Sequence, residues 1–90
     1  MDFTTLDPIY ARRALENTQE INYKTLFLLQ GKIDDLESGH FDPVPEESSL
    51  TEDGKTDLRK KVSTGLEAEL EKTHHAIAQC AGWLSQLDNV

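Results

Sequence analysis

The chain has 90 residues and a formal net charge of −8, which is enough for one domain and too little for a large enclosed core. Hydrophobic residues make up 37% and charged residues 29%, a balance typical of helices that each bury one apolar stripe. The negative charge argues against nucleic-acid binding, and no segment is apolar enough to cross a bilayer or to form a signal peptide. Cys80 is the only cysteine, so an intrachain disulfide is excluded and a reducing, cytoplasmic location is expected.

The first predicted helix covers about residues 8–38. Asp7 can accept backbone N–H groups as a cap, and Pro8 suits the first helical position because its missing N–H would have no partner there. Gly39 follows the last periodic residue, where a left-handed cap is common. Gly31 costs about 1 kcal/mol against Ala inside a helix, so it can mark a bend or a close helix approach. The residues expected to share one broad face are Ala11, Ala14, Leu15, Thr18, Ile21, Asn22, Leu26, Leu29, Ile33 and Leu36.

Two aromatic residues of the same helix, Tyr23 and Phe27, lie four residues apart and off this face, so they form a second small patch. Two interpretations stay open. The patch is covered locally, by lysine side chains or by the partner helix, or it is a surface for a second protein, where Tyr and Phe are favoured anchors. Trp83 also lies to one side of the apolar stripe of the second predicted helix. We predict that Tyr23, Phe27 and Trp83 bind a partner.

Residues 39–49 are predicted to form a loop. Pro43 and Pro45 interrupt regular helix and push the residues before them toward extended geometry. Phe41 and Val44 are its other apolar residues, and they either cap the end of the helical core or form an extended docking peptide.

The excess negative charge lies in one stretch, residues 34–53, which contains acidic residues and neither Lys nor Arg. Such a block either solubilises the loop or attracts a basic protein. The basic residues Arg59, Lys60 and Lys61 follow it, and charge pairing between the two is expected when the helices fold back. The acidic residues predicted to form a client surface are Asp34, Asp35, Glu37, Glu46 and Glu47.

The second predicted helix covers about residues 50–87. Ser49 and Glu52 fit a capping box, in which each side chain bonds to the other residue's backbone N–H. Gly54 loosens the first turn, so the firm helix is expected to begin nearer Lys55. Further along, apolar or small residues recur at alternating steps of four and three, the heptad pattern of a coiled coil. They are Leu66, Leu70, Thr73, Ile77, Cys80, Leu84 and Leu87, preceded by Leu58 and Val62.

A loop of about a dozen residues favours antiparallel pairing of the two helices. The predicted fold class is all-α: one domain, residues 1–90, forming an antiparallel hairpin of two long helices that dimerisation or a partner completes to a four-helix bundle. Asn22 and Thr73 then share a middle layer, where polar residues fix the register at a cost in stability. The predicted helix-pairing seam consists of Ala11, Leu15, Leu26, Leu29, Ile33, Leu66, Leu70, Ile77 and Leu84.

No motif for catalysis or for a cofactor is present in the sequence. His74, His75 and Cys80 lack the ligand spacing of a helical metal site, and there is neither a glycine-rich phosphate loop nor a nucleophile motif. Cys80 is expected to be a small core residue. We therefore predict a non-enzymatic protein-interaction module without metal or cofactor, a scaffold or adaptor subunit that self-associates or assembles with partner helices.

A second class of function stays open. The small size, acidity and helical content are similar to those of type III secretion chaperones, a resemblance that implies binding of a client protein. In this interpretation the acidic stretch 34–53 engages a basic client, and mimicry of nucleic acid is one form that this binding could take. Electrostatic binding weakens steeply with salt, whereas a buried apolar seam hardly responds.

Overall fold

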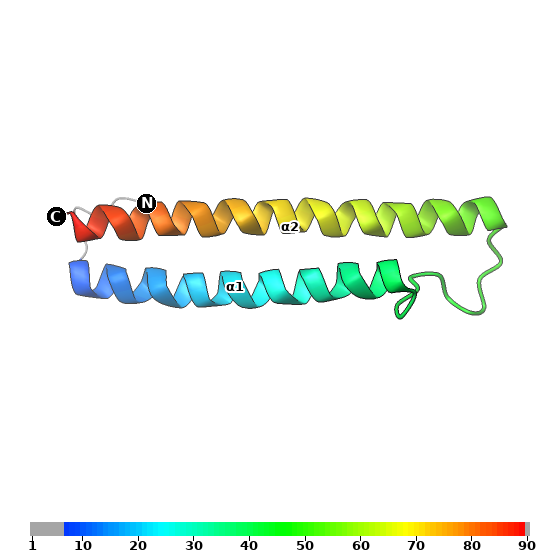
Figure 1. Cartoon of the computed structure of the whole chain (residues 1–90), viewed down its shortest axis with the longest axis horizontal. Coiled ribbons are helices and arrows are strands. Elements are labelled where there is room, and N and C mark those ends of the chain that lie inside the picture. Colours follow the sequence, from blue (N-terminus) through cyan, green and yellow to red (C-terminus); the bar gives the residue numbers. More distant parts are fainter. Residues whose placement is uncertain (1–6, 90) are drawn as a thin grey trace.

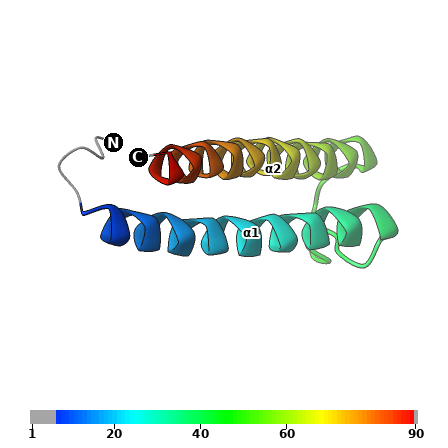
Figure 2. The same cartoon turned by 60° about the vertical axis from the view of Figure 1, so that its left-hand side comes forward.

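The computed structural model of the chain describes residues 7–89, which form two helices and one connecting loop (Figure 1). The helices α1 (Pro8–Ser38) and α2 (Glu52–Asp88) have 31 and 37 residues. They lie side by side and antiparallel in both views (Figures 1 and 2). The molecule measures 59 × 20 × 18 Å, which is a rod two helices wide. The predicted all-α hairpin is confirmed, and its completion to a four-helix bundle stays a prediction.

The core is a thin line of side chains between the helices. Leu15 and Cys80, with exposed fractions of 4% and 1%, are its best-buried large and small members, and they lie at the end of the hairpin opposite the loop (Figure 1). The Cys80 thiol donates to the Leu15 carbonyl oxygen at 3.2 Å, and Ala11 and Leu87 complete this cluster. Most of the remaining seam is only half-buried, because each helix has one neighbour. The half-buried residues include Leu26, Leu29, Ile33, Leu36, Leu58, Val62, Leu66, Leu70, Ile77 and Leu84.

Polar contacts across the seam fix how far one helix slides along the other. The Gln19 amide Nε2 donates to the Ile77 carbonyl oxygen at 2.9 Å, and Arg12 forms an ion pair with Asp88. Together with the contact of Leu15 described above, these bonds give the register that the sequence predicts. Gln19 is absent from the predicted seam because it is polar, although its spacing of four from Leu15 places it on the same side of the helix.

The expected polar middle layer is present, but its members bond within their own helices. Asn22 donates to the Gln19 side-chain oxygen at 3.1 Å. The buried Thr73 donates from its hydroxyl to the Glu69 carbonyl oxygen at 2.8 Å. Gln19 therefore makes the cross-helix bond of this layer, and Asn22 holds the Gln19 side chain in place.

Both ends of α1 follow the sequence prediction. The Asp7 side chain accepts a hydrogen bond from the Ile9 backbone N–H at 2.9 Å, and Pro8 lies in the first turn, where no N–H is needed. At the other end, Gly39 has a φ of 82°, a left-handed conformation that disfavours any residue with a Cβ. Its N–H donates to the Leu36 carbonyl oxygen, which closes the helix.

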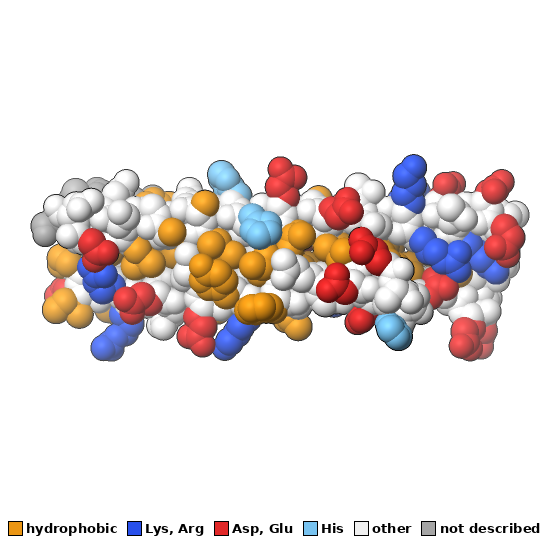
Figure 3. Space-filling view, viewed as in Figure 1, with side chains coloured by type: hydrophobic (Ala, Val, Ile, Leu, Met, Phe, Trp, Pro, Cys, Tyr) orange, Lys and Arg blue, Asp and Glu red, His pale blue; other side chains and the backbone are white. Residues whose placement is uncertain are grey.

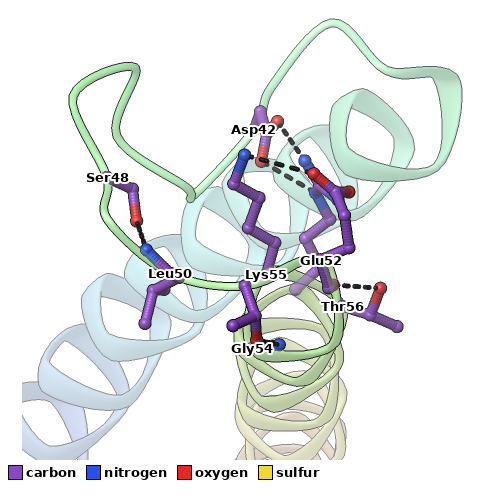
Figure 4. Close-up of polar contacts among 9 residues, drawn as sticks. Asp42, Ser48, Leu50, Glu52, Gly54, Lys55 and Thr56 are labelled. Atoms are coloured by element: carbon purple, nitrogen blue, oxygen red, sulfur yellow. Dashed lines mark hydrogen bonds and ion pairs between the residues drawn. The ribbon is translucent and has the colours of Figure 1, made fainter.

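The start of α2 differs from the prediction (Figure 4). The capping residue is Thr51, whose hydroxyl accepts from the Gly54 N–H at 3.1 Å, so the predicted Ser49 capping box is wrong. The Leu50 N–H instead bonds to the Ser48 hydroxyl at 3.2 Å, and this local turn keeps the segment before Thr51 outside the helix. The helix therefore begins with Glu52 and includes Gly54, rather than starting near Lys55.

Two glycines give a matched test of these backbone assignments. Apart from the backbone of its own helix, nothing in the described structure lies within 4 Å of the position that a side-chain Cβ would take at Gly31. The predicted close approach of another helix at Gly31 is therefore wrong within the hairpin. We expect Gly31→Ala to stabilise the fold by about 1 kcal/mol through helix propensity. Gly39→Ala is expected to destabilise it by about 1–2 kcal/mol because of its positive φ. Thermal melts followed by circular dichroism measure both, and a lower melting temperature for Gly31→Ala would contradict the assignment.

Candidate protein-interaction surface

α1 carries apolar side chains on three sides, and α2 covers one of them. At about 100° per residue, Tyr23 and Phe27 lie roughly 100° to one side of the line that faces α2. Ile21 and Leu28 lie roughly 120° to the other side. The apolar sector of α1 is therefore wider than the sector that one neighbouring helix covers.

The first uncovered side is the aromatic patch, which we define as Tyr23 and Phe27. Phe27 is 71% exposed and Tyr23 is 47% exposed, so the side chains of their own helix and of α2 leave them largely uncovered. In the face drawn in Figure 3, hydrophobic side chains gather along and beside the line where the helices meet, and charged ones lie at both ends of the rod and along its edges. The predicted role of the patch in binding a partner stays a prediction, and its exposure is consistent with it.

The second uncovered side is the isoleucine stripe, which we define as Tyr10, Ala14, Ile21 and Leu28. Ile21 and Leu28 are 63% and 68% exposed, and Ala14 is exposed as well. The sequence places Ala14 and Ile21 on the broad apolar face of α1 but outside the predicted helix-pairing seam, and both are exposed in the hairpin. One neighbouring helix covers only a narrow sector, and these residues lie outside it. Their repeat at positions 14, 21 and 28 was the available signal, since a seven-residue repeat keeps to one side of a helix.

Trp83 lies apart from the aromatic patch. It is half-buried and packs against the core cluster that contains Leu15 and Cys80. Because Cys80 is level with Leu15, Trp83 is level with the first turns of α1, several turns away from Phe27 along the rod. The structure therefore does not bring together the three residues predicted to bind a partner, and Trp83 closes the end of the core.

The predicted acidic client surface is exposed at the loop end of the rod. Its members are Asp34, Asp35, Glu37, Glu46 and Glu47, all of them exposed. Within the described chain, none of these five takes part in an ion pair at 4 Å or less. Their use by a client stays a prediction.

The expected charge pairing between the acidic stretch and the basic cluster is made by Asp42, a loop residue outside that surface. Asp42, labelled in Figure 4, accepts two hydrogen bonds from Arg59 of α2, at 3.1 Å from Nε and 2.9 Å from Nη2. The Val44 N–H donates to the same carboxylate at 3.0 Å. The Arg59 hydrogen bonds, followed by the Val44 bond, lower the pKa of Asp42 to about 2. The loop is thereby fastened to α2.

This ion pair gives a testable pH dependence. The pKa of Asp42 lies below its ordinary value of 3.8 in the folded chain, so its stabilisation is complete above that value and is lost as the pH falls toward about 2. In Arg59→Gln we expect the pKa of Asp42 to return toward 3.8 and the acid-induced loss of stability to become smaller. Carboxyl carbon shifts measured by NMR during an acid titration report the pKa directly. Lys60→Gln is the control, and an unchanged pKa in Arg59→Gln would contradict the pairing.

Cys80 has the core role that the sequence predicts. Its thiol is buried, and burial raises its pKa, so the reactive thiolate is scarce in the folded state. We expect a disulfide reagent to label Cys80 roughly 100-fold more slowly in the native chain than in denaturant. Ser85→Cys in a Cys80→Ala background places an exposed thiol one turn away and serves as the fast control. Equal labelling rates for the two would contradict burial of Cys80.

Residues 7–89 contain no group of three or more His, Cys, Asp or Glu arranged to hold a metal ion. Three depressions formed by these residues are each confined to one helix or its start. Two lie on α2, from Ala68 to Gln79 and from Asp57 to Thr64, and one lies at the start of α1, from Asp7 to Arg13. Within residues 7–89, neither helix combines the length and the apolar character that crossing a bilayer requires.

Comparison of the chain with protein-family models, with curated proteins and with solved structures gives no match. Function is therefore inferred from the residues described above.

Proposed function

We propose that the chain is a non-enzymatic protein-interaction module, a helical hairpin that docks helices of another protein as a small scaffold or adaptor subunit. The observation that carries the proposal is the exposure of Phe27, 71%, beside Tyr23 in the middle of α1. Exposed aromatic pairs of this kind are favoured anchors in protein interfaces. The uncovered sides of α1 also support completion to a four-helix bundle, because further helices would bury what α2 leaves in water.

Charges around the aromatic patch indicate the chemistry of the partner. Residues seven apart share one side of a helix, so Glu16 lies in line with Tyr23, and Asp34 lies in line with Phe27. The patch thus has an acid beyond each end along α1. A complementary helix would present apolar anchors in its centre and Lys or Arg toward its ends.

Substitution of Phe27 tests the proposal. We expect Phe27→Ala to weaken retention of bound proteins from an extract of the native cells by about tenfold or more, the effect of removing a central aromatic anchor. Phe41→Ala is the matched control, because Phe41 is an exposed aromatic residue in the loop. Quantitative mass spectrometry of the retained proteins measures the effect, and circular dichroism checks that helicity is kept. Equal retention by Phe27→Ala and the wild-type chain would contradict the proposal.

An acidic regulator or chaperone is the second candidate, supported by the five exposed acids of the client surface. Glu46 and Glu47 lie in the loop, where a basic client would reach them without displacing α2. Binding through them would fall steeply as salt rises from about 50 to 300 mM, and Glu46→Gln with Glu47→Gln would reduce it. Retention that survives the salt and depends on Phe27 supports the interaction module instead.

A further inference from the structure

We propose that the isoleucine stripe is the contact surface for a second copy of this chain, which packs antiparallel on α1 about a two-fold axis at Ile21. The proposal deepens the proposed function, because it names the occupant of one uncovered side of α1. The aromatic patch lies on another side of the helix and stays available to a different protein.

The residues of the stripe are uncharged, and the hydroxyl groups of the threonines beside it are already satisfied. Between Tyr10 and Leu28 the stripe is bordered by Thr18 and Thr25 on the edge toward α2. Asn17 and Lys24 border the other edge, where Lys24 is paired with Glu20. The Thr18 hydroxyl donates to the Ala14 carbonyl oxygen at 2.9 Å, and Thr25 donates to the Ile21 carbonyl oxygen at 2.9 Å. Covering these threonines therefore strands no hydroxyl hydrogen, and the usual penalty for burying a polar group is reduced.

When two copies of the stripe run antiparallel, the side chains of one copy are complementary in size to those of the other. A two-fold axis at Ile21 sets Ile21 against its own copy. It also sets Ala14 against Leu28 of the second copy, and this small-to-large contact occurs twice. A closed dimer requires this self-complementarity, in which each residue meets the same partner on both chains. The same axis brings Tyr10 level with Lys32 of the second copy, a pairing of an aromatic ring with a cation.

The hairpin exposes more surface than a compact monomer of the same mass, and this excess is similar to the area that a stable homodimer buries. The chain exposes 6892 Å², whereas a compact monomer of this mass exposes about 5,300 Å². The excess is roughly 1,600 Å² per chain and about 3,200 Å² for two. Obligate homodimers bury about 2,000–5,000 Å². A second hairpin on the isoleucine stripe would make a four-helix bundle and cover a large part of this excess.

The solution mass of the purified chain, measured by light scattering at about 100 µM, tests the proposal. The chain of 10.1 kDa is expected to give about twice that mass. Ile21→Glu places a charge on the axis twice, and we expect it to weaken the dimer at least 30-fold and to give the monomer mass. Phe27→Glu puts the same charge on the aromatic patch and is the matched control, expected to stay dimeric.

A second variant tests the geometry without disrupting the surface. Ile21→Cys in a Cys80→Ala background is expected to form a disulfide-linked dimer on mild oxidation, because the two thiols face each other at the axis. Phe27→Cys in the same background is expected to stay uncrosslinked.

Three results would overturn the proposal. They are a monomeric wild-type chain at 100 µM, a dimer that Ile21→Glu leaves intact, and a dimer that Phe27→Glu alone dissolves, which would assign self-association to the aromatic patch. Binding of a different protein to the isoleucine stripe in place of a second copy would appear as the first result. Failure here is separate from failure of the proposed function, which is read from retention of other proteins by Phe27 variants.

Discussion

Two helices can cover only one side of each other, and most features of this protein follow from that constraint. The line of contact is fully buried at one end, where Leu15 meets Cys80, and only half-buried toward the loop. The hairpin therefore has a defined register and a thin core. Its remaining apolar side chains lie in water unless another chain covers them, and this exposure is the basis of the proposed assemblies.

The register is set at several points along the rod. Arg12 and Asp88 pair near the chain ends, Gln19 reaches across in the middle, and Arg59 holds Asp42 of the loop at the far end. The exposed ion pairs contribute little stability individually. The Arg12–Asp88 pair joins the two helices and matches one alignment of them, whereas the Asp42–Arg59 pair joins the loop to α2. Apolar burial therefore supplies most of the stability, and polar contacts select the alignment of the two helices.

The two helices have different roles in the proposed assemblies. α1 carries the aromatic patch and the isoleucine stripe on separate sides, so one helix can contact a second copy and another protein at once. The outer surface of α2 carries mixed polar and charged residues, including the exposed His74 and His75. The two surfaces of α1 also differ in charge. The four residues of the isoleucine stripe, from Tyr10 to Leu28, are uncharged, whereas acids lie in line with the aromatic patch.

Local signals in the sequence determined the helices, the bounds of α1 and the antiparallel register, because caps and heptad spacing act within a few residues of chain. Only the tertiary structure decided which apolar residues are covered. Ile21 shares the composition of the seam but lies outside the sector that one neighbouring helix reaches, and Trp83 joins the core end rather than the aromatic patch. The cap at Thr51 and the pairing of Asp42 with Arg59 likewise depended on the path of the loop, which no periodic pattern encodes. Spacing gives the side of a helix on which a residue lies, whereas burial depends on how many helices surround it.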